Sequence, residues 1–318
     1  MKTLSVVIPV YNEVENVPLM AARIHEALAG MDYEVIFVDD GSKDGTVKAV
    51  RQLDDSRIKL VEFMRNFGQS SAMMAGIQAA EGEWIATLDG DLQNDPIDIP
   101  DMLRRAREED WDMVAGVRAN RKDGFLLRKL PSRIANRIIQ RSTGVRIKDY
   151  GCSLKVMRAQ VAKQIGIYGE LHRFIPVLIA LQGGRITQMD VRHHPRQFGE
   201  SKYGLGRTFR VMADLLLMLF MLRYQQRPIH LFGTWGLLIF VIGVLINLFM
   251  FGMKLAGADI WGKPLLLLGI FLTLGGIQLI TFGIMFEIQN RTYYESQGKR
   301  PYTIRNIFVG KDKVKSDS

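Results

Sequence analysis

Asp89 and Asp91 are the residues of this sequence best suited to chemistry. They are separated only by Gly90 and follow an apolar run, residues 84–88, that has the pattern of a short buried strand. Two carboxylates that leave a strand together can reach one hard cation, and Mg²⁺ or Mn²⁺ commonly shares such ligands with substrate phosphates. The pair therefore indicates a site for a metal-bound diphosphate. A solvated turn explains the same pattern when it stands alone.

Two further polar clusters follow predicted strands nearer the N-terminus. One strand is the apolar run 4–8, which we expect to end at Pro9, and the other is the run 35–38. The polar residues that follow these runs are Tyr11, Asn12, Glu13, Asp39 and Asp40. Three such clusters at the ends of three strands favour a common binding site over three unrelated turns.

Strand and helix patterns alternate along residues 1–120. Helical spacing occurs at 17–28 and 70–80, a helix start at Asp44 provides an N-cap acceptor, and further strands are expected at 58–63 and 113–117. This alternation predicts an α/β fold with a mainly parallel sheet, in which ligands bind beyond the carboxyl ends of the strands. The glycine-rich dinucleotide and P-loop motifs, the serine nucleophile elbow and the His-Glu-x-x-His zinc motif are absent, which disfavours those enzyme classes.

Two stretches are long and apolar enough to cross a membrane. No Asp, Glu, Lys or Arg occurs at residues 228–253 or 264–286, and about 20 apolar residues span a hydrocarbon core. Because only a short connection separates the stretches, they should form a hairpin with both ends on one side. Arg and Lys flank those ends, which predicts that they lie in the cytosol. A pair of buried helices in a soluble core is the alternative.

The N-terminus, the cysteine content and the net charge all agree with a cytosolic location for the residues that precede the hairpin. Met1 leads directly into a strand pattern and not into a signal peptide, so we expect residues 1–228 and 290–318 to be cytosolic. The single cysteine, Cys152, excludes an internal disulfide and fits a reducing compartment. The net charge of +9 is explained by anionic lipid and phosphate ligands, and no nucleic-acid signature accompanies it.

Basic residues concentrate between the predicted sheet and the hairpin. Residues 118–146 are strongly basic, and within them Arg128 and Ser132 share a face of a predicted helix. A second basic group begins at Arg196 and ends at Lys202. Residues 211–222 are apolar and too short to span a bilayer, so we expect an interfacial helix there, with a plain core helix as the alternative.

Taken together, these motifs resemble the GT-A fold, family 2 glycosyltransferases. The segments that carry the resemblance are residues 7–13 (VIPVYNE), 38–46 (VDDGSKDGT) and 89–93 (DGDLQ). Residues 65–68 (RNFG), 149–152 (DYGC) and 196–202 (RQFGESK) are similar to the polyprenyl-phosphate branch, which includes dolichol-phosphate mannose synthase and bactoprenol glucosyltransferases. The likeness covers residue 4 to about 310. Gly90 departs from the alanine of many relatives, which we expect to loosen the loop without removing a ligand.

The resemblance implies a role for each matching residue. Mg²⁺ or Mn²⁺ bridging the donor diphosphate would be held by Asp89, Asp91 and Gln93. The nucleoside half of the donor would be held by Pro9, Tyr11, Asn12, Glu13, Asp39, Asp40 and Arg65. The acceptor phosphate would be held by Arg118, Arg128, Ser132 and Arg196, with Lys202 assisting at the membrane surface. Arginine suits this task because its planar fork binds phosphate through two charge-assisted hydrogen bonds.

The implied activity is metal-dependent transfer of a hexose, with UDP-glucose favoured as donor, to undecaprenyl phosphate at the cytoplasmic face of the inner membrane. The acceptor phosphate is already ionised at neutral pH, so in-line displacement needs no general base and would invert the anomeric centre. A separate flippase and a later transferase acting on a cell-envelope glycan are then expected. The alternatives are a processive polysaccharide synthase of the same fold and a non-catalytic membrane scaffold that binds nucleotide sugars.

Four segments are predicted from these observations. They are a GT-A catalytic domain at 1–203, a juxtamembrane interfacial helix at 204–228, two membrane-spanning helices at about 229–253 and 264–287, and a cytosolic tail at 290–318. In the second spanning helix, Gly275 and Gly276 would allow close helix packing, including packing in a homo-oligomer.

Overall fold

A computed structural model describes residues 2–118, 140, 147–167, 169, 171–195, 220, 229–296, 307–309 and 312–314. The chain divides into two compact units, Met1–Leu217 and Met218–Ser318. Several predicted features lie outside the described residues. They are Arg128, Ser132, Arg196, Lys202 and, apart from Phe220, the interfacial helix at 211–222.

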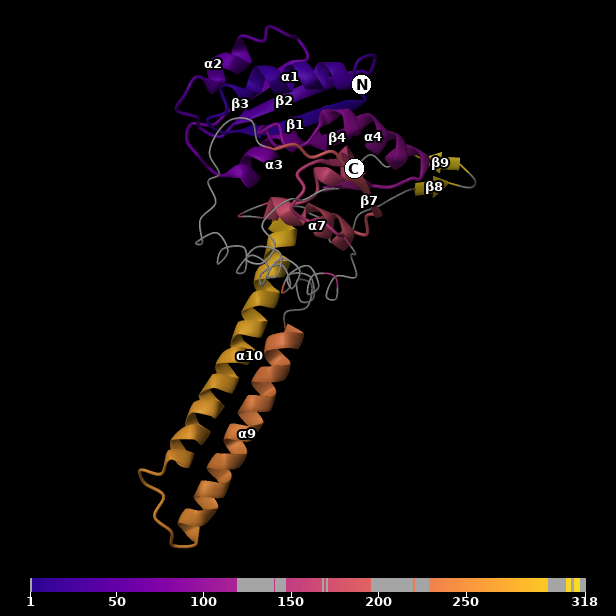
Figure 1. The fold of residues 1–318 in the computed structure, drawn as a ribbon. Helices are drawn as coiled ribbons and strands as arrows, with labels where there is room; N and C mark the ends of the chain where they lie inside the picture. Colours follow the sequence, from indigo (N-terminus) through magenta and orange to yellow (C-terminus); the bar gives the residue numbers. More distant parts are fainter. Residues whose placement is uncertain are drawn as a thin grey trace. The chain divides into compact units, whose positions relative to one another are not determined.

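The first unit contains a seven-stranded sheet with the order β3-β2-β1-β4-β6-β5-β7 (Figure 1). Its strands are β1 (Leu4–Val10), β2 (Tyr33–Asp39), β3 (Ile58–Glu62), β4 (Trp84–Thr87), β5 (Met113–Arg118), β6 (Lys155–Arg158) and β7 (Ile186–Val191). Only β6 is antiparallel to its neighbours, β4 and β5, and the other pairs are parallel. The predicted mainly parallel sheet is therefore confirmed, and β2, β1 and β4 end side by side.

β1 does not end at Pro9 as predicted, but continues to Val10. Its pairing with β4 stops at Val7, whereas its pairing with β2 runs on to the end of the strand. The carbonyl of Val7 accepts a hydrogen bond from the N–H of Leu88 on the β4 side, and Pro9 faces that same side two residues later. The N–H that proline lacks thus falls where β4 offers no partner, which explains why the strand tolerates it.

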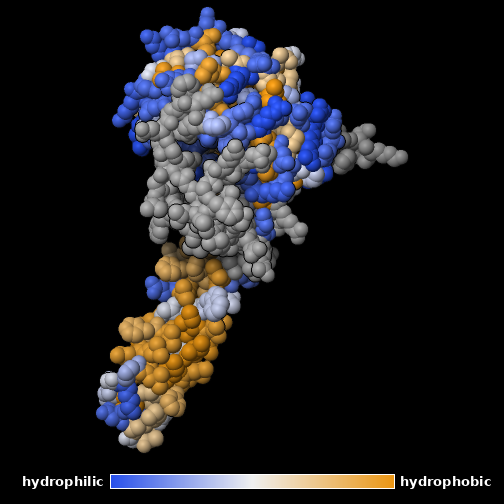
Figure 2. Space-filling model, in the orientation of Figure 1, coloured by the Kyte–Doolittle hydropathy of each residue, from blue (hydrophilic) through white to orange (hydrophobic). Residues whose placement is uncertain are grey.

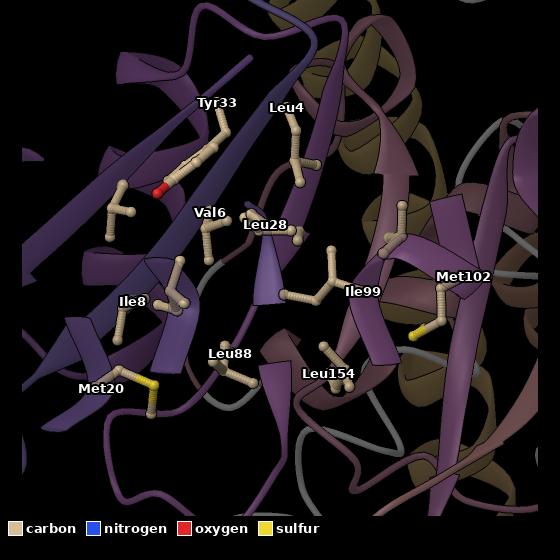
Figure 3. Close-up of a cluster of buried hydrophobic side chains, with 14 of the residues drawn as sticks. Leu4, Val6, Ile8, Met20, Leu28, Tyr33, Leu88, Ile99, Met102 and Leu154 are labelled. Atoms are coloured by element: carbon tan, nitrogen blue, oxygen red, sulfur yellow. The ribbon is translucent and has the colours of Figure 1, made fainter. Parts of the chain in front are cut away.

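Helices cover both faces of this sheet. They are α1 (Asn16–Ala27), α2 (Thr46–Arg51), α3 (Gln69–Ala79), α4 (Ile99–Glu108), α6 (Ala159–Ala162) and α7 (Ile175–Leu181), with 3₁₀ turns η1 (Pro96–Asp98) and η2 (Leu171–Phe174). On one face, Leu4, Val6 and Ile8 of β1 form a core with Met20 of α1 and Met102 of α4 (Figure 3). The alternation along β1 places these three side chains on the same face.

The opposite face is covered by α3, which lies close to β1 and β2. A side chain at Gly76 in this helix would overlap Val7 of β1 and Val38 of β2. Glycine is therefore required for the close approach of α3 to the sheet. This contact brings the N-terminus of α3 to the edge at which β2, β1 and β4 end.

The second unit contains a hairpin of two long helices, α9 (Ile229–Leu255) and α10 (Pro264–Ser296). Both contain 27-residue stretches long and apolar enough to cross a membrane, Ile229–Leu255 and Pro264–Asn290. Figure 2 shows a hydrophobic surface over most of the hairpin. Two short strands, β8 (Ile307–Val309) and β9 (Asp312–Val314), form a separate antiparallel pair.

Glycines allow α9 and α10 to pack closely. A side chain at Gly276 would overlap the backbone of Phe240, and the amide of Asn247 donates a 3.1 Å hydrogen bond to the hydroxyl of Thr273 on the facing helix. Small residues and interhelical hydrogen bonds are typical of helix contacts in membranes. The close packing expected of Gly276 thus occurs within the chain, whereas a side chain at Gly275 would contact no described atom within 4 Å.

Candidate active site

The loop that follows β1 is held to the loop that follows β2. The N–H of Asn12 donates to the hydroxyl of Ser42 at 2.8 Å, and the N–H of Lys43 donates to the side-chain oxygen of Asn12 at 2.8 Å. The N–H of Glu13 donates to the hydroxyl of Thr46 at 2.9 Å. These reciprocal bonds hold Asn12 at a φ of 54°, a left-handed conformation that asparagine tolerates better than most residues.

The same edge carries the other predicted residues of the first cluster. Pro9 is buried in β1, while Tyr11 and Glu13 are partly exposed in the loop beyond it. The helix start predicted near Asp44 is present, because α2 begins at Thr46, but the N-cap position belongs to Gly45 and carries no side-chain cap. The carboxylate of Asp44 instead accepts the N–H of Thr46 at 2.9 Å from just before the helix. The two loops therefore form one ordered edge above β1 and β2.

Asp39 and Asp40 are both buried at the end of β2 but differ in their partners. Oδ2 of Asp39 accepts the N–H of Ser42 at 2.9 Å, whereas its buried Oδ1 accepts no hydrogen bond from any described residue. The carboxylate of Asp40 accepts the N–H groups of Phe67 at 2.7 Å and Gly68 at 3.0 Å. Asp39 thus keeps one buried carboxylate oxygen without a hydrogen-bond donor among the described residues, while Asp40 holds the loop that follows β3.

Burial raises the pKa of Asp40, and the two backbone hydrogen bonds oppose that rise. The loop after β3, which Asp40 holds, also packs directly on Gly41, where a side chain would overlap the backbone of Arg65. Gly41 has a φ of +70°, so glycine satisfies both the backbone conformation and the close approach. The guanidinium of Arg65 lies 4.3 Å from the ring centroid of Phe67, which places the predicted cation at this edge.

Asp89 and Asp91 lie just beyond β4 and are fixed by hydrogen bonds. Oδ1 of Asp89 accepts the side-chain N–H of Gln69, the first residue of α3, at 2.7 Å. The backbone N–H of Asp89 donates to the hydroxyl of Ser153 at 3.2 Å, and Oδ1 of Asp91 accepts the N–H of Gln93 at 3.2 Å. The three candidate metal ligands therefore share one turn.

The turn itself is tightly packed. Leu92 has a φ of 60° and a side chain that is completely buried, so burial holds an unfavourable backbone conformation in place. Gly90 is also buried, and a side chain there would approach Val10 to 2.9 Å. In this structure the missing side chain of Gly90 serves close packing against β1.

The electrostatics of the turn fit a divalent cation. Burial, followed by the charge of Asp91, raises the pKa of Asp89, while Lys155, Ser153 and Arg173 act in the opposite direction. A cation between two carboxylates relieves their repulsion. Among the described residues no group of three or more His, Cys, Asp or Glu could hold a metal. A metal at this pair would therefore take further ligands from water or phosphate, as Mg²⁺ and Mn²⁺ commonly do.

Arg118 is the one predicted acceptor-binding residue that the structure describes. At the end of β5, its Nε donates to Asp149 Oδ2 at 2.6 Å and its Nη2 donates to Oδ1 at 2.9 Å. Asp149 also accepts the N–H of Gly151 at 3.1 Å. The guanidinium is thus held in a bidentate ion pair with Asp149, and its contact with a phosphate stays a prediction.

Several residues of this site were not predicted from the sequence. Gln69 orients Asp89, and its signal was its position directly after the RNFG segment. Ser153 supports Asp89 from 64 residues away and also accepts the amide of Asn94 at 2.8 Å. Arg173, whose positive charge lowers the pKa of Asp89, lies in η2 far along the chain. No local pattern links Ser153 or Arg173 to the carboxylates.

Comparisons of sequence identify relatives that match nearly the whole chain. The family model for "Glycosyl transferase family 2" matches residues 5–166. The dodecaprenyl-phosphate galacturonate synthase of Rhizobium johnstonii is 46% identical over 313 residues, covering 96% of this chain and 93% of the relative. The undecaprenyl-phosphate 4-deoxy-4-formamido-L-arabinose transferase of Serratia proteamaculans is 36% identical, covering 96% and 94%.

Solved structures of the glucosyl-3-phosphoglycerate synthase from Mycobacterium tuberculosis share the fold. Its complex with Mn²⁺, uridine diphosphate and glucosyl-3-phosphoglycerate gives a TM-score of 0.54 at 15% identity, covering 70% of this chain and 80% of that one. Its complex with Mg²⁺ and uridine diphosphate gives the same TM-score and identity, covering 70% and 79%. At this identity the likeness shows the fold alone.

Proposed function

The chain belongs to glycosyl transferase family 2 and has the GT-A fold, and from this premise we propose that it transfers a sugar from a UDP-linked donor to a polyprenyl phosphate. The observation that carries the proposal is that Asp89, Asp91 and Asp39, whose buried Oδ1 has no hydrogen-bond donor among the described residues, all lie at the edge where β4, β1 and β2 end. The names of relatives that span nearly the whole chain support a polyprenyl phosphate as acceptor.

Asp89 and Asp91 would hold Mg²⁺ or Mn²⁺, with Gln93 in the same turn. When bound, the ion supplies positive charge that stabilises the departing diphosphate. The fit of two close carboxylates to a hard cation supports this assignment, as do the Mn²⁺ and Mg²⁺ complexes of the structural relative. Gln69 keeps Asp89 oriented through its 2.7 Å hydrogen bond.

The reaction is a single displacement. A phosphate oxygen of the acceptor forms a bond to the anomeric carbon, while the bond from that carbon to the β-phosphate oxygen breaks and UDP leaves with the electron pair. The acceptor is already ionised, so no proton has to be removed. Arg118, Arg128, Ser132 and Arg196 would hold the acceptor phosphate in line, since orientation lowers the barrier of such a step.

Which sugar the donor carries requires a separate test. Glucose is the expectation from the sequence, whereas the names of the relatives give galacturonate and 4-deoxy-4-formamido-L-arabinose. Purified full-length protein should be incubated with undecaprenyl phosphate, Mg²⁺ or Mn²⁺, and a panel of labelled UDP-sugars. We expect label from one donor to enter the organic phase as a single lipid product. Label in a polymer would indicate a processive synthase, and bound but untransferred donor would indicate a scaffold.

The basic segment after β5 provides a second test. Arg128→Ala and Ser132→Ala should each raise the KM for the lipid phosphate about tenfold or more, because a charge-assisted contact to phosphate is lost. Binding of UDP, measured by calorimetry with Mg²⁺, should stay nearly unchanged. Equal losses in UDP affinity and acceptor use would assign these residues to the donor site instead.

Membrane topology is the third prediction. We propose that the enzyme lies in the inner membrane with residues 1–228 and 290–318 in the cytosol, because Arg and Lys flank the helix ends. An impermeant thiol reagent applied to intact cells should label Asp259→Cys, in the connection between α9 and α10, and spare Ser316→Cys. The natural Cys152 is buried and provides a low background. The opposite labelling pattern would overturn the orientation.

On this topology the spanning helices anchor the enzyme. One hairpin offers no polar path for a sugar phosphate, so the product would need a separate flippase and a later transferase. A homo-oligomer would use the hairpin surface that the contact between α9 and α10 leaves open.

A further inference from the structure

Helix α10 meets α9 along one stripe of residues. The residues of this stripe recur at steps of three and four, and they are Gly269, Thr273, Gly276, Ile280 and Gly283. Such steps keep residues on one side of a helix, because a turn of the helix takes 3.6 residues. The contact within the hairpin therefore uses one side of α10.

A second stripe with the same steps lies on the opposite side of α10, and we call it the outer stripe. Gln278 follows Gly276 by two positions, which is about 200° around a helix, so it lies across the helix from the contact with α9. The outer stripe consists of Leu267, Phe271, Leu274, Gln278, Thr281 and Met285, all of which are exposed in this chain. A mainly apolar stripe with this spacing is the pattern along which two helices pair.

The outer stripe carries one amide that has no partner within the described residues. The hydroxyl of Thr281 donates to the carbonyl of Ile277 in its own helix at 3.0 Å, whereas the amide of Gln278 forms no hydrogen bond with any residue that the structure describes. Gln278 lies near the middle of the apolar stretch Pro264–Asn290. When that stretch spans a membrane, the amide lies in hydrocarbon that holds no water, where an unpaired polar group is strongly unfavourable.

A second copy of this chain offers the matching group at the right depth. Two copies that insert with the same topology have parallel α10 helices, and a two-fold axis along the membrane normal brings identical residues to the same depth. A carboxamide carries both donors and an acceptor, so the amide of Gln278 can pair with its counterpart in the second copy. Lipid chains offer no such group, and a different protein would need a polar side chain at this same depth.

We propose that two copies of this chain associate in the membrane through the outer stripe of α10, with the amide of Gln278 in each copy hydrogen-bonded to that of the other. The apolar residues of the stripe pack against their counterparts, and the single amide pair fixes the register, as one polar position does in parallel helix pairs. The inference rests on the proposed membrane-spanning hairpin and does not depend on the sugar-transfer reaction.

Association can be measured on full-length protein in vesicles of phosphatidylethanolamine and phosphatidylglycerol. Energy transfer between copies labelled at the N-terminus, followed as lipid is added, gives the dissociation constant of the dimer. Gln278→Leu should raise this constant about five- to thirtyfold, which corresponds to about 1–2 kcal/mol for a hydrogen bond between membrane helices. Gln278→Asn keeps an amide on a shorter side chain and should recover part of the association. Gln289→Leu is the matched control, because Gln289 lies near the end of the stretch, where water and headgroups can bind its amide, and it should change the constant less than about twofold.

Disulfide cross-linking identifies the surface that the two copies share. Leu274→Cys places a thiol on the outer stripe, and oxidation of the membranes should join two copies through it. Leu245→Cys is the matched control on α9, because both leucines are 60% exposed and lie at a similar distance from the connection between the helices. It should give little cross-linked dimer. The natural Cys152 is buried and contributes a low background.

Other outcomes would overturn the inference. Energy transfer no greater than random proximity in the bilayer would show that the wild type is a monomer. An unchanged dissociation constant for Gln278→Leu would show that the amide does not hold the copies together, and equal cross-linking at Leu245→Cys would place the contact elsewhere on the hairpin. External labelling of Asp259→Cys, added to Gln278→Leu, confirms that this variant still inserts. Absence of any lipid-linked sugar product would refute the proposed function and leave the association result standing.

Discussion

Asp91→Asn is expected to lower transfer of the sugar by about a thousandfold or more, which corresponds to about 4 kcal/mol of lost transition-state stabilisation. Asp91 and Asp89 are the paired carboxylates of the proposed metal site, and an amide removes the charge that holds the cation. Initial rates should be measured with the best donor of the panel, in Mg²⁺ and in Mn²⁺. Removal of divalent cations from the wild type by EDTA should reproduce the loss, and restored Mg²⁺ or Mn²⁺ should reverse it.

The same substitution should not unfold the protein. The charge of Asp91 raises the pKa of Asp89, so the two carboxylates repel each other in the metal-free protein. We therefore expect the melting temperature of metal-free Asp91→Asn to equal or exceed that of the wild type. Asp101→Asn, an equivalent change at an exposed residue of α4, should keep full activity. Substantial transfer by Asp91→Asn, or by the wild type without metal, would falsify the metal assignment.

Glu34→Gln is expected to destabilise the catalytic unit by about 3 kcal/mol at pH 7. The side chain of Glu34 is fully buried, accepts the hydroxyl of Ser5 at 2.6 Å, and pairs with Lys59 at 2.9 Å and Lys2 at 3.2 Å. Although burial alone would raise its pKa, the hydrogen bond from Ser5 and the lysine contacts lower the pKa from 4.5 to about 2. A shift of this size corresponds to about 3 kcal/mol by linkage.

The sign of this shift defines the pH window. Because the folded pKa lies below the unfolded one, the stabilisation is complete above about pH 4.5 and is lost as the pH falls toward about 2. The difference in unfolding free energy between wild type and Glu34→Gln should therefore shrink across that window. A difference that stays constant from pH 7 to pH 3 would contradict the shifted pKa.

Unfolding can be followed in the first unit alone. Replacing Trp235 and Trp261 of the second unit with phenylalanine leaves Trp84 and Trp111 as the fluorescent reporters, and Trp84 is 1% exposed in β4. Urea titrations of the detergent-solubilised protein then give the free energy of unfolding at each pH. Glu62→Gln is the matched control, because its ion pair with Arg51 is exposed and should contribute less than about 1 kcal/mol.

Local patterns in the sequence determined much of the fold. Apolar runs correctly located β1 to β5, and helical spacing located α1 and α3, because these elements bury one face or both against a common core. The charge-free stretches located α9 and α10, since both helices contain 27-residue stretches that are long and apolar enough to cross a membrane. The prediction that β1 ends at Pro9 was wrong. Proline interrupts a strand only where a neighbouring strand would pair with the N–H that proline lacks, and the pairing with β4 has already stopped at Val7.

Elements with weaker local signals were missed. β6 has only four residues and begins with the buried charge of Lys155, so its apolar pattern is short. Its antiparallel place between β4 and β5 depends on the order in which strands pair, which no local pattern records. By contrast, α4 carries apolar residues at helical spacing, including Ile99, Met102 and Leu103, so its sequence contains a local helical signal.

The residues of the candidate site were predicted from the sequence, but their hydrogen-bond partners were not. Asp39, Asp40, Asp89 and Asp91 were found from the sequence because parallel strands deliver the residues after them to one edge. Only the tertiary structure decided which of these carboxylates are satisfied by the loops, since Asp40 accepts the N–H groups of Phe67 and Gly68, whereas one buried oxygen of Asp39 has no donor among the described residues.

Only the tertiary structure, likewise, brought Ser153 and Arg173 to Asp89, across 64 and 84 residues of chain. Identity and spacing along the chain predict a side chain's chemistry and the strand end that carries it. Contacts across such separations depend on how the sheet is ordered and how helices pack on it. They formed here because β6 pairs with β4, the strand that leads to Asp89, and because η2 packs on α3.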